Sequence, residues 1–123
     1  MRAFAIAAMA AGLMLAAAPV RAADAEAGAR VFRTQCGACH AVEAGKNRVG
    51  PSLFGVVGRT SGEVKGFRYS AANRNAKLTW TPEVLDKYLT NPREVVPGTI
   101  MTYAGLRNAT QRANLIAYLE TLK

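Results

Sequence analysis

Apolar residues recur at helical spacing in two segments of the C-terminal half of the chain. The first begins with Thr-Pro-Glu at residues 81–83, a capping hydroxyl, a proline and a first-turn acid, and Asn-Pro at residues 91–92 ends it. The second begins near Asn108, with Gln111 as a capping partner. Both are predicted to be helices because their apolar side chains share a face. Those side chains are Val84, Leu85, Tyr88 and Leu89 in the first and Leu115, Ile116, Leu119 and Leu122 in the second.

The rest of the chain predicts two more helices joined by loops. One runs from Asp24, a suitable N-cap, to about Cys36, and a short one spans residues 70–76. Residues 41–70 are rich in glycine and lack a sustained period, so they are predicted to be loop, as are residues 93–107. No segment alternates long enough to indicate a strand. The predicted fold class is therefore all-α, with four or so short helices, and a loop of about 30 residues indicates that it wraps something.

Residues 1–22 have the pattern of a secretory leader. Arg2 supplies a positive start, residues 3–18 form an uncharged apolar run, and Pro19 ends it. Cleavage after the following Val-Arg-Ala would leave one domain, residues 23–123. An uncleaved membrane anchor is the alternative, but the run is shorter than the roughly 20 residues that a spanning helix needs. Export to the periplasm is therefore expected.

Charge and length narrow the classes of partner. The 123 residues suit one small domain with a formal net charge of +8, and loss of Arg2 and Arg21 with the leader would leave +6. The basic residues are scattered without interleaved aromatics, and export argues against nucleic acid as a partner. The charge instead favours a diffuse field that steers association with an acidic protein.

Both cysteines and the single histidine lie within five residues, as Cys36, Cys39 and His40. A thiol–disulfide pair is one interpretation, but such motifs follow a β-strand, whereas a helix precedes this one. A zinc site is another, but zinc usually takes four ligands and the chain has no further cysteine or histidine. The third is c-type haem attachment, for which Cys-x-x-Cys-His is the specific signature. Two thiols would add to the vinyl groups of one haem, and the adjacent imidazole would reach its iron.

Met101 is the one methionine outside the predicted leader and the candidate for the opposite face of the iron. It ends a turn-rich loop, residues 95–101, rather than lying on a helix face. Imidazole and thioether together give the Met/His ligation of electron-transfer haems, which raises the reduction potential. A flexible core filler is the alternative role for this side chain.

Seven short segments occur in an order typical of one family. They are CGACH, VGPSLFGVVGR, GFRYSAAN, LTW, LDKYLTNP, VPGTIMTYAG and LIAYLETL. On these segments the chain resembles the class I cytochromes c of mitochondria and the bacterial periplasm, over essentially all of Asp24 to Lys123. The resemblance implies the cytochrome c fold, in which short helices and long loops wrap one covalently bound haem.

The resemblance also implies how the haem is held. Cys36 and Cys39 would form the thioethers. His40 would be the proximal ligand, with the Pro51 carbonyl accepting its other N–H, and Met101 the distal ligand. The residues implied to bind the haem propionates are Arg59, Tyr69 and Trp80, and those implied on the distal polar network are Asn73, Tyr88 and Thr99. On the residues alone, Trp80 and Tyr88 could be core aromatics and Arg59 a surface charge. Gly28 and Phe32 of the first helix are implied to pack on Leu115 and Tyr118 of the last.

Several positions near the expected haem edge depart from the family pattern, in which lysines are frequent. Gln35 precedes the first cysteine and Ile100 precedes the methionine. Glu94 adds a negative charge beside Arg93, and Tyr103 stands where relatives often have phenylalanine. The steering field is therefore expected to be weaker than in strongly basic relatives.

The resemblance implies a soluble periplasmic electron carrier with one haem c, not an enzyme. Its expected partners are transient redox proteins, a reductase and an oxidase or reaction centre, with acidic docking faces. A monomer is expected, without nucleic acid and without stable membrane insertion. Two rival functions stay open: a haem enzyme or ligand sensor would need an open sixth position on the iron, and a tethered cytochrome would keep residues 1–22.

Overall fold

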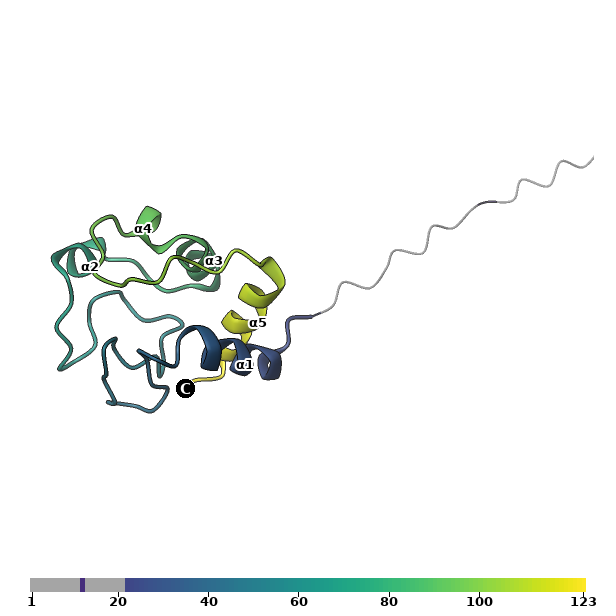
Figure 1. Cartoon of the computed structure of the whole chain (residues 1–123), viewed down its shortest axis with the longest axis horizontal. Helices are drawn as coiled ribbons and strands as arrows, with labels where there is room; N and C mark the ends of the chain where they lie inside the picture. The colour runs from purple at the N-terminus through teal and green to yellow at the C-terminus, as the bar shows by residue number, and fades with distance from the viewer. Residues whose placement is uncertain (1–11, 13–21) are drawn as a thin grey trace, which may run out of the picture.

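The structure is a computed structural model that describes residue 12 and residues 22–123. This part of the chain forms five helices, with long loops after the first and the fourth, as Figure 1 shows. The only β structure among these residues is an isolated antiparallel bridge between Thr60 and Thr79. The all-α prediction is confirmed. The helices are α1 (Ala25–Gln35), α2 (Ala71–Ala76), α3 (Pro82–Thr90), α4 (Pro92–Val95) and α5 (Ala109–Glu120).

The predicted leader, residues 1–22, lies outside the described residues except for Gly12 and Ala22. Within the part of the chain that the structure describes, no helix is both long and apolar enough to cross a membrane.

Helices α1 and α5 cross at close range, although their sequences lie some 80 residues apart in the chain (Figure 1). The Asp24 side chain caps α1 by accepting the N–H groups of Glu26 and Ala27 at 2.9 and 3.1 Å. Gly28 is buried against the backbone of α5, where a Cβ atom would collide with the carbonyl group of Asn114. The predicted packing of the first helix on the last is confirmed by the Phe32 and Tyr118 rings, whose centroids lie 5.7 Å apart.

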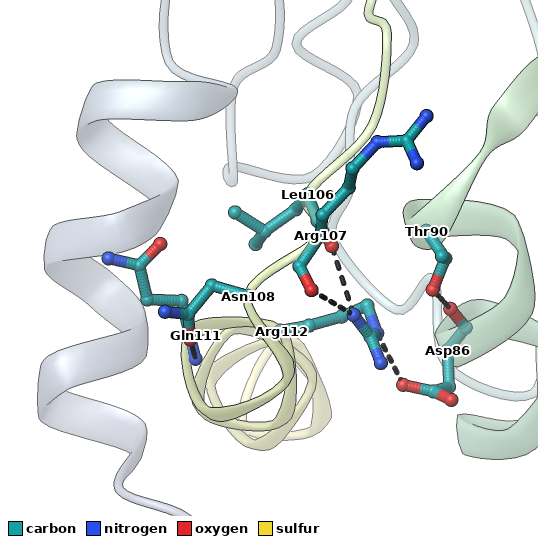
Figure 2. A network of polar contacts seen from close by, with 7 residues as sticks. All are labelled: Asp86, Thr90, Leu106, Arg107, Asn108, Gln111 and Arg112. Carbon is teal, nitrogen blue, oxygen red and sulfur yellow. Dashed lines mark hydrogen bonds and ion pairs between the residues drawn. The ribbon is translucent and has the colours of Figure 1, made fainter.

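An ion pair joins α3 to α5 (Figure 2). Nε of Arg112 lies 2.6 Å from Oδ1 of Asp86, and the same guanidinium donates to the carbonyls of Leu106 and Arg107 at 3.0 and 3.3 Å. The side chain of Arg112 is only 12% exposed, because it lies under the segment that leads into α5. This contact fixes the start of α5 against α3, and the predicted Asn108 cap completes it by accepting the Gln111 N–H at 2.9 Å (Figure 2).

Two details differ from the sequence predictions. Residues 93–95 belong to α4, although residues 93–107 were expected to be loop. Asn91 adopts an extended conformation that ends α3, and Pro92 starts a new turn that the Val96 N–H closes on the Pro92 carbonyl at 2.9 Å. Leu122, assigned to the buried face of the last helix, lies beyond the end of α5 and is half-buried.

Candidate functional site

The loops and helices enclose a cavity of about 340 Å³. The side chains that line it come from the α1 end, the long loop after it, α2, α3, the loop after α4 and α5. Every residue predicted for the site lines this one cavity. They are Cys36, Cys39, His40, Pro51, Arg59, Tyr69, Asn73, Trp80, Tyr88, Thr99 and Met101.

His40 is held on one wall by its Nδ1 atom, which lies 2.7 Å from the carbonyl oxygen of Pro51. A carbonyl can only accept, so Nδ1 carries the proton and donates, and Nε2 is left as the nitrogen available to a metal. Burial lowers the pKa of His40, which favours the neutral ring that a metal needs. Gly50 packs against this ring, where a Cβ atom would overlap the imidazole. The sequence predictions missed Gly50, although its place directly before the carbonyl partner could have indicated it.

The two thiols lie beside that wall. The His40 and Cys39 N–H groups both donate to the Cys36 carbonyl, at 3.0 and 3.1 Å, so a tight turn keeps both cysteines next to the histidine. Burial, with the neighbouring Cys39 as a second cause, raises the pKa of Cys36 to about 11. Redox-active thiols need a lowered pKa, so this environment disfavours a thiol–disulfide pair. No group of three or more histidine, cysteine or acidic residues in the described part could hold a metal ion, which disfavours the zinc interpretation.

Met101 lines the same cavity and is held by two polar contacts. The Tyr88 hydroxyl donates to its Sδ atom at 3.8 Å, and its own N–H donates to Oγ1 of Thr99 at 3.2 Å. Burial raises the pKa of Tyr88 to about 12, so the hydroxyl keeps its proton and stays a donor. In the same cavity, Oδ1 of Asn73 is buried without a hydrogen-bond partner among the described residues. A buried acceptor without a partner in the cavity lining fits a site completed by a further group.

Arg59 supplies a positive charge inside the cavity. Burial lowers its pKa, and its guanidinium donates to the carbonyls of Ser52 and Phe54, both at 3.1 Å. Among the described residues no carboxylate forms an ion pair with it. A half-buried cation without an anion fits a ligand that carries carboxylates, as haem does.

Two aromatic residues of the site belong both to the hydrophobic core and to the cavity lining. Trp80 and Tyr88 are buried in the main core cluster with ring centroids 4.7 Å apart, and both also line the cavity. Tyr69 is buried and accepts the Val64 N–H on its hydroxyl at 3.1 Å. The apolar lining from Leu53, Val56, Leu85, Leu115 and Leu119 was not assigned to the site from the sequence.

An all-α fold around an apolar cavity, with two thiols and an imidazole on one wall and a thioether also lining it, defines a c-type haem protein. Comparison with known proteins identifies its family. The Cytochrome c family profile matches residues 25–123, and the chain belongs to the cytochrome c family. The protein is thus an electron carrier rather than an enzyme, and Cys36 and Cys39 form the paired-cysteine motif of its covalent haem c.

Individual relatives agree over most of both chains. The chain is 49% identical over 100 residues to cytochrome c of Euglena viridis, covering 81% of this chain and 98% of the relative. It is 52% identical over 96 residues to cytochrome c2 of Rhodopila globiformis, covering 78% of this chain and 91% of the relative. Among solved structures, cytochrome cH from Methylobacterium extorquens matches with a TM-score of 0.75 and 42% identity. The match covers 80% of this chain and 98% of that structure.

Proposed function

We propose that this cytochrome c is a periplasmic carrier that shuttles single electrons between transient redox partners, with His40 and Met101 as the axial ligands of its haem. The observation that carries the proposal is that an imidazole with a free Nε2, a thioether and both cysteines line one cavity. Arg59, Tyr69 and Trp80 would receive the propionates, and the half-buried unpaired guanidinium supports that assignment.

When bound, the haem would supply an iron that takes up and releases one electron. The residues of the chain would limit how far the structure rearranges when the iron changes its oxidation state. The Pro51 carbonyl fixes the orientation of His40. The Tyr88 hydroxyl donates to the sulfur of Met101, and Oγ1 of Thr99 holds the Met101 backbone by accepting its N–H. A ligand set that is already ordered needs little rearrangement in either oxidation state, and two protein ligands leave no position for a substrate.

Optical spectra of the oxidised and reduced holoprotein test this ligation. We expect a low-spin reduced spectrum and the weak long-wavelength band of sulfur–iron ligation in the oxidised protein. Met101→Ala should keep the covalent haem, lose that band and lower the reduction potential. Thr102→Ala in the same loop is the control and should keep the band. A high-spin spectrum that shifts with carbon monoxide would contradict the proposal and favour a haem enzyme or sensor.

Export by a cleaved leader, residues 1–22, is the second part of the proposal and rests on the sequence pattern. The intact mass of the protein from a periplasmic extract tests it. A mass that begins at Ala23 supports cleavage, and a mass that includes residues 1–22 in the membrane fraction would indicate a tethered cytochrome instead.

A further inference from the structure

Asn47 lies in the long loop after α1, and its side-chain amide makes two hydrogen bonds. Its Oδ1 atom accepts the Ser52 N–H at 3.0 Å, and its Nδ2 atom donates to the Lys65 carbonyl at 3.2 Å. These partners fix the orientation of the amide, because a backbone N–H can only donate and a carbonyl can only accept. Asn47 therefore joins two stretches of the loop through one planar group.

The Ser52 N–H belongs to the same peptide group as the Pro51 carbonyl, which accepts the Nδ1 proton of His40 at 2.7 Å. The hydrogen bonds consequently form one chain. It runs from the imidazole through the Pro51–Ser52 peptide group and the amide of Asn47 to the Lys65 carbonyl. We refer to this chain of hydrogen bonds as the amide relay.

Both middle members of the amide relay accept at oxygen and donate at nitrogen, the arrangement in which hydrogen bonds polarise and strengthen one another. The surroundings favour this effect, because Ser52 is only 3% exposed and hydrogen bonds are electrostatically stronger away from water. Donation by the Ser52 N–H moves electron density toward the Pro51 oxygen. The oxygen then becomes a better acceptor for the Nδ1 proton of His40, and a stronger hydrogen bond at Nδ1 makes the imidazole a more basic ligand.

We propose that Asn47 is a positioning residue that raises the electron-donating strength of His40 through the amide relay and so lowers the reduction potential of the haem. This inference rests on the proposed function, in which His40 ligates the iron. A more electron-rich imidazole would stabilise ferric iron more than ferrous iron. Asn47 would act on the iron only through Ser52, Pro51 and His40.

Asn47→Ala in the holoprotein ends the relay at Ser52 and should raise the reduction potential. At a fixed solution potential, the ratio of ferrous to ferric protein should increase about threefold, which corresponds to ~28 mV at 59 mV per tenfold. In NMR spectra of the reduced protein, the resonance of the His40 Nδ1 proton should move upfield, because its hydrogen bond weakens. An unchanged value of either quantity would overturn the proposal.

Ser52→Ala is the matched control for loss of loop structure. The Ser52 hydroxyl donates to the Glu43 carbonyl at 2.6 Å and accepts the Phe54 N–H at 3.2 Å. Alanine removes both bonds but keeps the backbone N–H and carbonyl of residue 52. The variant should lose stability in denaturant unfolding, with a native potential and a native Nδ1 resonance. A rise in potential as large as that of Asn47→Ala would assign both effects to loop structure and refute the relay.

Asn47→Asp tests the direction of the effect. A carboxylate accepts the Ser52 N–H more strongly than an amide does, so the potential should fall below the native value. Ala44→Asp adds the same charge at an exposed position of the same loop, outside the relay. In high salt, which screens exposed charges, Asn47→Asp should keep the larger shift. A rise in potential for Asn47→Asp, or equal shifts in the two aspartate variants, would overturn the proposal.

Optical spectra of the native protein and of every variant distinguish the two possible failures. Loss of the His/Met features in the native protein refutes the proposed function. Intact native features, with a potential that does not respond to Asn47 substitutions, refute the amide relay alone. If Asn47→Ala does not fold around its haem, the comparison of Asn47→Asp with Ala44→Asp decides the proposal by itself.

Discussion

Replacement of Gly28 by alanine should test how closely α1 and α5 must approach. A Cβ atom at this position would lie 2.5 Å from the carbonyl carbon of Asn114 and 2.8 Å from the Cβ atom of Tyr118. Neither of these atoms can rotate away, so the helices would have to separate by roughly 1 Å to restore ordinary van der Waals distances. The separation would also loosen the contact between the Phe32 and Tyr118 rings.

Two effects of opposite sign determine how Gly28→Ala changes the free energy of unfolding. Alanine in a helix interior is favoured over glycine by about 1 kcal/mol. Overpacking a buried site costs about 1–3 kcal/mol, and the upper end applies because the collision is with backbone. The expected net loss is about 2 kcal/mol in the free energy of unfolding, or a fall in Tm of about 10 °C for a domain of this size.

Guanidinium chloride unfolding of the holoprotein, followed by far-ultraviolet circular dichroism, measures this loss. Ala113→Gly, at an exposed position of α5, is the matched control for helix propensity and should lose about 1 kcal/mol. If Gly28→Ala were as stable as the native protein or more stable, propensity would dominate and the close crossing would not be a constraint.

Three further substitutions test separate contacts. Cys36→Ala removes one thioether and should weaken or abolish stable haem attachment, seen as loss of haem stain on a denaturing gel; undiminished stain would contradict the assignment. Tyr103→Phe removes the hydrogen bond that the Tyr103 hydroxyl donates to Oε1 of Gln35 at 2.9 Å, which joins the loop after Met101 to the end of α1. It should speed displacement of the sixth ligand by imidazole about fivefold, while Tyr118→Phe should not. Asp86→Asn removes the negative charge that pairs with the mostly buried Arg112. It should lower the free energy of unfolding, measured with denaturant, by about 1 kcal/mol. A smaller loss in high salt than in low salt would agree with a charge effect.

Helix starts were predictable because their chemistry is local. Asp24, Thr81 and Asn108 each accept backbone N–H groups at the start of a helix, as their position in the sequence suggested. Ser70, which was expected to lie within the short helix of residues 70–76, caps that helix in the same way. Helix α4 was missed because Asn-Pro ends one helix and can start another with equal ease. The choice between a loop and a further turn depends on packing, and Pro92 is among the most completely buried side chains.

The site was predictable where its residues belong to motifs, and less so where they are brought together only by the fold. The Cys-x-x-Cys-His signature has a fixed spacing, so Cys36, Cys39 and His40 could be assigned from five letters. Gly50, which packs against the His40 ring, has no such signature. Its position depends on the return of the loop to His40, which the Gly50 N–H secures by donating to the Cys39 carbonyl at 2.8 Å. A contact of this kind follows from the folded path and not from composition.

The size of the cavity explains why so much loop is ordered around it. A cavity of about 340 Å³ within a single small domain, if emptied of its haem, would cost about 8 kcal/mol at the usual ~24 cal/mol per Å³. That cost is comparable with the whole stability of a typical domain, about 5–15 kcal/mol. The loop of residues 36–70 has little regular structure of its own to offset the loss. The haem would therefore be part of the hydrophobic core as well as the redox centre, and the residues proposed to ligate it would also hold the loops in place.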